Sequence, residues 1–237
     1  MKPVTIQFID SNTPYSPLFQ DFYYTPGLGI EESSYVYLEG SGFINSLKSE
    51  KGKTQFNVGE IGFGVGLNFL LTYRQFLKNS SPSQILTYVT AEKHPVTIEG
   101  LQELYPQFPE LSEYSKELLE QYPELTPGVH LLNFNEGRVK LVLMLGDAQE
   151  MFFNLKLKTE QKIEYWYWDG FSPSKNPDAF QETLFKGLIP ISTPRAIAAS
   201  FTAAGWVRRG LESSSFRVEK RLGFANKREC IRVHFPE

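Results

Sequence analysis

The segment VGEIGFGVGLNFLLTYRQFL, residues 58–77, combines an apolar strand, a glycine-rich turn and a helix. Gly62, Gly64 and Gly66 alternate where the chain must turn sharply and where a ligand can approach a backbone without Cβ atoms. Glu60 stands at the carboxyl end of the expected strand, where open α/β sheets bind their ligands. The segment therefore predicts a nucleotide-type cofactor site.

The spacing of the glycines distinguishes between cofactors. A dinucleotide fingerprint reads G-x-G-x-x-G and holds a pyrophosphate at the helix N-terminus, whereas GFGVG places its third glycine one residue early and follows an acid. A carboxylate beside the turn repels phosphate and attracts hydroxyl or ammonium groups. S-adenosylmethionine has no phosphate and carries ribose hydroxyls, an amino acid end and a sulfonium, so we expect it here. The alternative is a glycine-rich turn that binds nothing.

Two more acids fall at the carboxyl ends of expected strands. Glu92 closes a strand at 85–92, and Asp147 closes a hairpin at 130–147. In a doubly wound sheet these ends share one edge with Glu60. We expect Glu92 to accept hydrogen bonds from ribose hydroxyls, and Asp147 and Ala148 to lie beside the adenine, whose amine would donate to Asp147. An acid at position 92 would also serve NAD, so it does not separate the cofactors by itself.

The richest strand end is the loop WDGFSPSKNP, residues 168–177. Methylation of an amine needs no covalent enzyme intermediate, only an unprotonated nitrogen in line with the methyl carbon. Asp169 can accept a hydrogen bond from such an amine, orient its lone pair and stabilise the cation that forms. Phe171 offers a face to a base or a cation. The alternative is a turn held together by Asx and proline geometry.

These residues are positioned by strands that alternate with helices from residue 56 onward. We expect strands at 56–61, 85–92, 162–169 and 194–202, helices at 67–78, 177–189 and 203–213, and a closing antiparallel pair at 216–222 and 227–235. This order predicts an α/β doubly wound sheet with an antiparallel C-terminal edge.

The N-terminal part of the chain has a different composition. Residues 1–50 are rich in Tyr, Phe, Pro and Gly, and they predict a small layer packed on the core, with a short strand at 35–40. Residues 51–237 would form the main domain, with a helical insertion at about 95–128.

Composition limits the class of protein. The chain has 237 residues, of which 41% are hydrophobic and 22% charged, as expected for a globular domain. It has no signal-like N-terminus and no apolar run of membrane-spanning length, so we expect a cytoplasmic enzyme. Cys230 is the one cysteine, and His94, His130 and His234 show no ligand spacing, so we expect no metal site.

Charge is unevenly distributed along the chain. Residues 186–232 contain ten basic and three acidic residues, although the whole chain has a net charge of −3. A basic segment of this kind favours an anionic partner. The alternative is that these side chains are spread over several faces of the molecule.

Four segments in this order resemble the methyltransferase domain of the bacterial bifunctional tRNA 5-methylaminomethyl-2-thiouridine biosynthesis enzyme: YYTPGLGIEESSYVYLEG, EIGFGVGLNFL, WDGFSPSKNPDAF and SFTAAGWVRRGLESSSFRVEKRLGFANKREC. The resemblance covers residues 21–232. It implies a class I S-adenosylmethionine-dependent methyltransferase fold and methylation of the aminomethyl group on the tRNA wobble uridine. It also implies cofactor contacts by Glu60, Gly62, Gly64, Gly66, Glu92 and Asp147, with Asp169 as the active-site residue.

Many members of that family continue into a flavin-dependent oxidase, and this chain contains no such region. We therefore expect a stand-alone form that uses no flavin and acts on aminomethyluridine supplied by another protein, such as a separate oxidase.

The resemblance also gives the basic C-terminal segment a use. We expect Arg208, Arg209, Lys227 and Arg228 to flank the pocket and hold phosphates of the anticodon stem loop, while Phe171 or a tyrosine stacks on a splayed base. Two alternatives stay open. One is a methyl or aminopropyl transferase that acts on a small amine, and the other is a non-catalytic tRNA-binding module.

Overall fold

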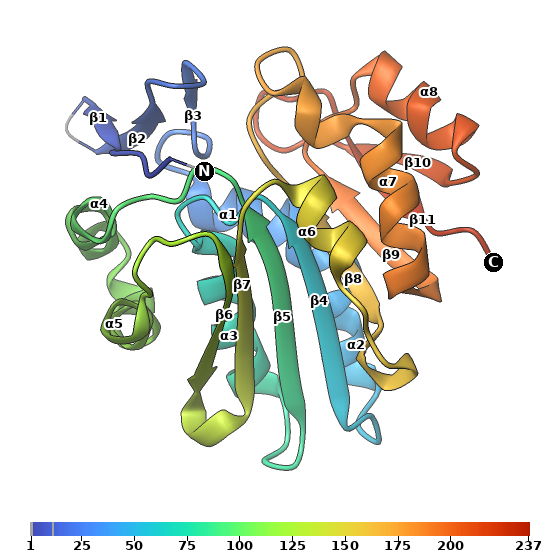
Figure 1. Ribbon diagram of the computed structural model, residues 1–237, viewed down its shortest axis with the longest axis horizontal. Coiled ribbons are helices and arrows are strands. Elements are labelled where there is room, and N and C mark those ends of the chain that lie inside the picture. Colours follow the sequence, from blue (N-terminus) through green and yellow to red (C-terminus); the bar gives the residue numbers. More distant parts are fainter. Residues whose placement is uncertain (1, 11) are drawn as a thin grey trace.

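The computed structural model describes residues 2–10 and 12–237, and its centre is a mixed sheet of eight strands (Figure 1). In spatial order the strands are β10 (Arg217–Leu222), β11 (Glu229–His234), β9 (Ser192–Ser200), β8 (Ile163–Trp168), β4 (Gln55–Ile61), β5 (Ile85–Glu92), β7 (Val139–Leu145) and β6 (Gly128–Phe134). The five strands from β9 to β7 are parallel, and β6, β11 and β10 pair antiparallel at the two edges.

The chain reverses its direction of winding between β4 and β8. It runs from β4 outward through β5 to β7, and then crosses back to β8 and β9 on the other side of β4. The carboxyl ends of neighbouring strands diverge at such a point, which leaves room for a ligand. The loops that follow β4 and β8 therefore meet at one place on the sheet edge.

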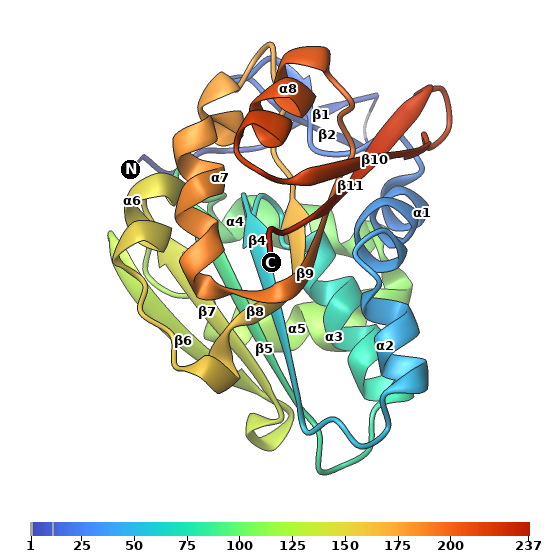
Figure 2. The same cartoon turned by 90° about the vertical axis from the view of Figure 1, so that its right-hand side faces the viewer.

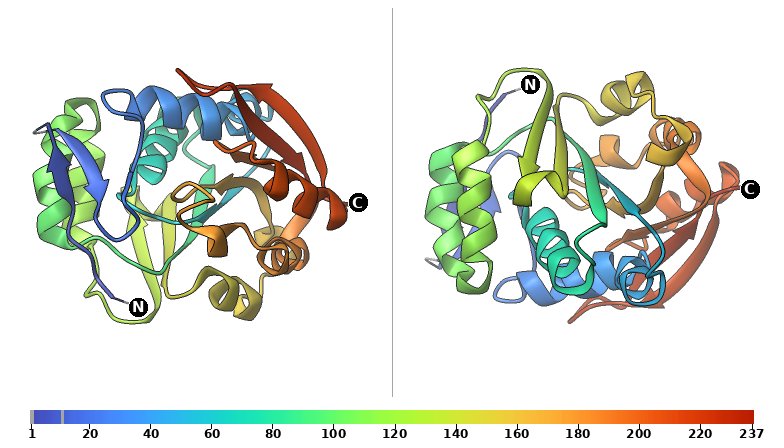
Figure 3. Two further views of the ribbon diagram at one scale, coloured as in Figure 1. Left: turned by 90° about the horizontal axis from the view of Figure 1, so that it is seen from above. Right: turned by 90° about the horizontal axis from the view of Figure 1, so that it is seen from below.

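Helices cover both faces of the sheet (Figures 2 and 3). One side carries α1 (Gly29–Ser33), η1 (Ser34–Glu39), α2 (Phe43–Ser49), α3 (Leu67–Asn79), α4 (Ile98–Leu104) and α5 (Ser112–Gln121), and the other carries α6 (Ala148–Asn154), α7 (Glu182–Leu188) and α8 (Gly205–Ser213). Short 3-10 turns connect them, namely η2 (Tyr105–Gln107), η3 (Pro109–Leu111), η4 (Asn135–Gly137), η5 (Thr159–Gln161), η6 (Pro177–Phe180) and η7 (Ile189–Ile191).

Strand β8 shows how one sequence serves two cores. Its residues Tyr165 and Tyr167 pack into the core on the side of the sheet that carries α3, whereas Trp166 and Trp168 pack into the core on the side that carries α7. Successive side chains of a strand point to opposite faces, so a strand between two helical layers is apolar throughout. The continuous aromatic run YWYW at residues 165–168 is the result.

Most of the expected elements are confirmed, but the strand expected at 35–40 is wrong. These residues form the helical turns of η1, which continue α1. Buried positions 29, 32, 33, 36 and 37 recur with helical spacing, so burial against the face of the sheet that carries α3 decides the conformation.

The helix expected at 177–189 is interrupted at Gln181, whose backbone is extended. This break lets Phe180 bury its ring beside Phe201.

The N-terminal residues lie at the end of the sheet where the parallel strands finish. Strands β1 (Gln7–Ile9), β2 (Thr13–Ser16) and β3 (Asp21–Phe22) form a small antiparallel sheet in the upper part of Figure 1. Its end is tied to the loop after β8, because Asp21 accepts hydrogen bonds from the backbone and hydroxyl of Ser172. The division of the chain at residue 50 stays a prediction.

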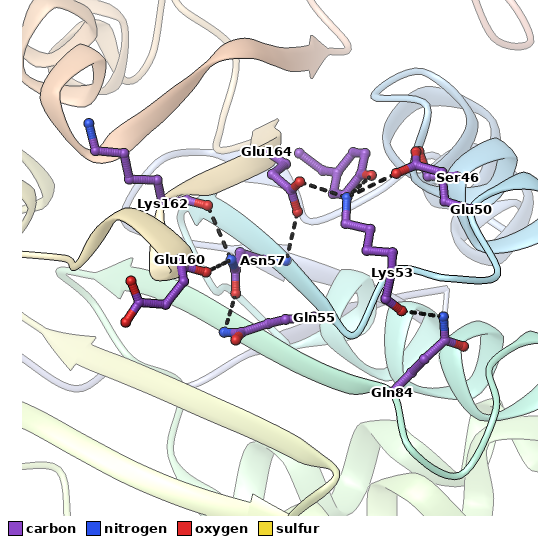
Figure 4. Close-up of polar contacts among 10 residues, drawn as sticks. Ser46, Glu50, Lys53, Gln55, Asn57, Gln84, Glu160, Lys162 and Glu164 are labelled. Carbon is purple, nitrogen blue, oxygen red and sulfur yellow. Dashed lines mark hydrogen bonds and ion pairs between the residues drawn. The ribbon is translucent and has the colours of Figure 1, made fainter.

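A polar network holds the opposite end of the sheet together (Figure 4). The Lys53 ammonium lies 2.6 Å from Glu164 and 3.0 Å from the Tyr165 hydroxyl. The buried Asn57 amide donates to the carbonyls of Glu160 and Lys162. Charged and amide groups satisfied in this way stabilise the register of β4 against β8 at their amino ends.

No helix in the described part of the chain combines the length and apolar character needed to cross a bilayer.

Candidate active site

The glycine-rich turn after β4 has the geometry that its sequence predicts. Gly62, Gly64 and Gly66 have φ values of +84°, +53° and +71°, a region that residues with a Cβ rarely occupy. Gly66 is the N-cap of α3, and its amide donates to the carbonyl of Phe63. The turn therefore brings bare backbone to the carboxyl edge of the sheet.

Glu92 holds this turn from the neighbouring strand. One carboxylate oxygen accepts the amide of Gly64 at 2.8 Å, and the other accepts the amide of His94 at 2.6 Å. Burial raises the pKa of Glu92, and the backbone donors oppose that shift. Each carboxylate oxygen can accept about two hydrogen bonds, so Glu92 retains capacity for a ligand hydroxyl.

A cavity of about 180 Å³ opens at this point. Seven of the predicted site residues line it: Gly62, Gly64, Glu92, Asp147, Ala148, Asp169 and Phe171. They come from the ends of four different strands, so the sheet topology brings together positions that are far apart in the sequence.

Asp147 has a double role at the cavity wall. Its Oδ1 accepts the amides of Gln149 and Glu150 and so caps α6, while its Oδ2 pairs with the Lys93 ammonium at 3.0 Å. These bonds lower its pKa against the effect of burial. The Asp147 side chain is 41% exposed, so a ligand at this position meets a solvated ion pair.

Glu60 does not line the cavity. It is 1% exposed and lies beneath the turn, where it accepts hydrogen bonds from the Asn68 amide at 2.9 Å and from the Thr90 hydroxyl at 3.1 Å. Burial, and then the charge of Asp169, raise the pKa of Glu60 well above its usual value. Gly66 is also set back from the cavity, as the cap of α3. Neither residue lines the cavity, so the direct cofactor contacts expected of them stay a prediction.

Asp169 lies at the exit of β8 and is held by three donors. Its Oδ1 accepts the Tyr37 hydroxyl at 2.6 Å and the Gly170 amide at 2.7 Å, and its Oδ2 accepts the Asn68 amide at 2.8 Å. Burial raises the pKa of Asp169 to about 6, although all three hydrogen bonds act in the opposite direction. The carboxylate is therefore ionised at neutral pH and fixed in orientation.

Sequence reasoning missed Tyr37 and Asn68. Asn68 is a polar residue inside the apolar run LNFLL, which is a signal that could have been used. Tyr37 could not be found, because the segment around it was expected to be a strand. Only the packing of η1 on the sheet brings its hydroxyl to Asp169.

Phe171 is already part of an aromatic cluster. Its ring stacks on Phe19 with centroids 4.4 Å apart, and the ring of Tyr23 contacts it edge-on with centroids 5.1 Å apart. Phe19 also contacts the ring of His94. The N-terminal segment thus closes over the loop after β8, and a ligand can reach only the part of Phe171 that these rings leave open.

The four basic residues expected at the pocket are not equivalent. Arg208 is half-buried and donates to the Ala203 carbonyl, while Arg209 and Arg228 are exposed. Lys227 lies 2.6 Å from Glu32, which is 5% exposed, and its ammonium lies over the ring of Phe201. None of the four lines the cavity beside the glycine turn.

A second hollow, of about 240 Å³, meets the first at Asp169. Its walls include Glu32, Tyr37, Phe201 and Lys227, and it shares Tyr23, Tyr24, Ser33, Asp169, Gly170 and Phe171 with the first cavity. Asp169 therefore lies between a cavity at the glycine turn and an aromatic hollow with acidic groups. This arrangement can hold two reactants on either side of one carboxylate.

Within the described residues no cluster of His, Cys, Asp or Glu has a metal-binding arrangement.

Comparison with known proteins identifies relatives of this chain. The family model described as S-adenosyl-L-methionine-dependent methyltransferase matches residues 109–235. The chain is 36% identical over 231 residues to the tRNA 5-methylaminomethyl-2-thiouridine biosynthesis bifunctional protein MnmC of Idiomarina loihiensis, and 37% identical over 241 residues to that of Pseudoalteromonas translucida. Each alignment covers 98% of this chain but only 38% and 36% of the relative.

The fold is also similar to a solved structure. The crystal structure of MNMC2 from Aquifex aeolicus matches with a TM-score of 0.75 at 20% sequence identity, covering 100% of this chain and 73% of that one. The class I methyltransferase fold expected from the sequence is thereby confirmed.

The residues of the first cavity fit S-adenosylmethionine. Glu92 offers acceptors to ribose hydroxyls, and the glycine turn leaves backbone accessible to an uncharged part of the ligand. The carboxylates at the edge favour a cationic sulfonium and disfavour a pyrophosphate. Glu92, the glycine turn, Asp147 and Ala148 would hold the cofactor.

Glu92→Gln should weaken binding of S-adenosylmethionine by roughly 10-fold to 100-fold, because one backbone amide and one ligand hydroxyl lose a charged acceptor. Isothermal titration calorimetry measures the change. Asp147→Asn is the comparison variant within the same site and should cost less, below about 10-fold, since Asp147 is solvated and already bonded. Binding by the Glu92 variant at wild-type strength would contradict the assignment.

Proposed function

The chain belongs to the S-adenosyl-L-methionine-dependent methyltransferase family, and from that premise we propose that it methylates the aminomethyl nitrogen of the tRNA wobble uridine. The reaction would convert 5-aminomethyl-2-thiouridine into 5-methylaminomethyl-2-thiouridine. The observation that carries the proposal is the position of Asp169, an oriented carboxylate between the cofactor cavity and an aromatic hollow. The similarity to the MnmC proteins, which are tRNA 5-methylaminomethyl-2-thiouridine biosynthesis proteins, supports the choice of substrate.

When bound, S-adenosylmethionine supplies an electrophilic methyl group. Asp169 lines both hollows, and its Oδ2 can accept an N–H of the incoming amine, which directs the nitrogen lone pair. The same carboxylate stabilises the positive charge that develops on nitrogen. Asp169 acts as an orienting group, because a pKa of about 6 is too low for it to deprotonate an alkylammonium efficiently.

The second hollow has the chemistry expected of a nucleobase site. Tyr23, Tyr24 and Phe201 supply aromatic surface on which a splayed base can stack. Asp169 places negative charge where an aminomethyl group would enter, whereas the charge of Glu32 is balanced by Lys227 in the same hollow. The anticodon stem loop is the partner that we propose, and a separate oxidase would supply the amine.

Transfer of label from S-adenosylmethionine to tRNA that lacks the modification tests the proposal. We expect labelled 5-methylaminomethyl-2-thiouridine after digestion, and loss of roughly 100-fold or more of the rate in Asp169→Asn, because the oriented charge is removed. The variant should retain stabilisation of its fold by the cofactor. Label on a free amine but not on tRNA would favour the small-amine alternative. Cofactor binding without any transfer would favour a non-catalytic module.

We propose that Arg209 and Arg228 bind tRNA phosphates, because both are exposed and no hydrogen bond or ion pair in the described residues engages their guanidinium groups. Arg208 would contribute from its half-buried position, whereas Lys227 is already paired with Glu32.

The double variant Arg209→Ala/Arg228→Ala should bind tRNA at least several-fold more weakly. The slope of log affinity against log salt should become shallower by about one for each phosphate that the variant no longer neutralises. Filter binding across a salt series measures both quantities. Arg195→Ala, an exposed arginine in the amino half of β9, serves as the control and should change neither. An unchanged salt slope in the double variant would exclude these phosphate interactions.

Tyr37→Phe should move the acid limit of methyl transfer to higher pH. The Tyr37 hydroxyl lowers the pKa of Asp169, so removing it raises that pKa above about 6, and the carboxylate protonates earlier as pH falls. Single-turnover rates between about pH 5 and 8 measure the shift. Protonation of the substrate amine is common to both enzymes and cancels in the comparison.

Tyr167→Phe is the matched control for this measurement. It removes another buried phenol, next to Tyr37 but bonded to Thr72 instead of Asp169. Superimposable profiles for wild type and Tyr37→Phe would show that the hydroxyl does not tune Asp169.

A further inference from the structure

Asn68 connects the two acids of the site and has one unused atom. It lies in the first turn of α3, is 5% exposed and lines the cofactor cavity. Its amide nitrogen donates to Glu60 Oε1 at 2.9 Å and to Asp169 Oδ2 at 2.8 Å. Its carbonyl oxygen is buried and has no hydrogen-bond partner among the described residues. A buried acceptor without a donor is costly and needs an explanation.

The orientation of the amide follows from its neighbours. The nitrogen lies within hydrogen-bond distance of two carboxyl groups. Turning the amide over would place the carbonyl oxygen against the ionised Asp169, and two acceptors would then repel each other. The carbonyl oxygen is therefore the atom that is left free.

Few acceptor positions remain at Asp169. Oδ1 already accepts from Tyr37 and Gly170, which uses its two lone pairs. Oδ2 accepts from Asn68 and has one position left. Asn68 and Asp169 both line the first cavity, and the hydrogen bond between them holds the Asn68 carbonyl oxygen close to that remaining position.

We propose that the Asn68 carbonyl oxygen and Asp169 Oδ2 together bind the two N–H groups of a primary amine, and that this pair limits the enzyme to a single methyl transfer. The inference rests on the proposed function and deepens it. With both N–H groups held, the remaining lone pair of the nitrogen is directed away from the two acceptors and toward the methyl donor.

The number of N–H groups on the amine before and after transfer explains why the enzyme would stop at one methyl group. The nitrogen lone pair forms the new N–C bond, the C–S bond breaks with its electrons remaining on sulfur, and the methylated nitrogen releases one proton to solvent. The secondary amine that results has one N–H, so it leaves one of the two acceptors unpaired. A site built for two donors discriminates against a ligand that has only one.

The test compares two substrates in the same assay. Wild-type enzyme is given tRNA carrying either the aminomethyl or the methylaminomethyl group, and initial rates of label transfer are measured. We expect the wild type to prefer the primary amine strongly. In Asn68→Ala both rates should fall because Asp169 loses one of its donors, but the rate with the primary amine should fall further, so the ratio should fall by roughly 10-fold or more.

Two further variants complete the experiment. Asn68→Ser provides a second truncation should the alanine variant fail to fold, as judged by thermal unfolding with and without cofactor. Thr72→Val is the matched control on the same helix. The Thr72 hydroxyl bonds to the Asn68 backbone carbonyl and to the Tyr167 hydroxyl, and not to Asp169 or to the Asn68 side chain, so this variant should leave the ratio unchanged.

The outcomes are distinct. A fall in the ratio, with dimethylated product appearing on long incubation, supports the second acceptor. An equal fall with both substrates would show that Asn68 only positions Asp169 and would overturn the proposal, as would an unchanged ratio. No transfer by the wild type to the primary amine would refute the proposed function itself, and this inference with it.

Discussion

The site depends on keeping one carboxylate ionised while it is withdrawn from water. Asp169 lies between two hollows, where burial favours its protonated form. Three donors oppose that tendency: the Tyr37 hydroxyl, the Gly170 amide and the Asn68 amide. They come from η1, the loop after β8 and α3, so these three parts of the chain must be correctly placed at once. The fold brings these three donors to Asp169 at the same time.

The sheet topology meets the requirement at the position where winding reverses. Strands β4 and β8 are neighbours and parallel, so the glycine turn and Asp169 emerge side by side. Glu92 on β5 supports the turn through the amide of Gly64 and also accepts the amide of His94 in the loop after its own strand. Beneath it the fully buried Glu60 has a raised pKa, first because of its burial and then because it is close to Asp169. The site therefore contains two acids of different roles, one ionised at the surface of the cavity and one held within the core.

Much of this arrangement could be predicted because the signals are local. Strand, turn and helix at residues 55–79 follow from apolar runs and from glycines that need positive φ. The acids at strand ends could be grouped by the rule that parallel strands finish at one edge. The segment around Tyr37 could not be assigned, because its alternation resembles a strand and only burial against the sheet makes it helical. The distribution of charged residues along the sequence likewise could not reveal the ion pair between Lys227 and Glu32.

The sequence by itself determined the class of fold and the cofactor turn, and it singled out Asp169 as the candidate reactive acid. Each of these depends on residue types within one short segment, where backbone geometry and chemistry are set locally. Tertiary structure alone decided that Glu60 is a core residue, that Tyr37 and Asn68 bind Asp169, and that the Asn68 carbonyl oxygen is unused. These are facts about which atoms meet across distant segments, and burial and hydrogen bonding are settled only when the layers pack together.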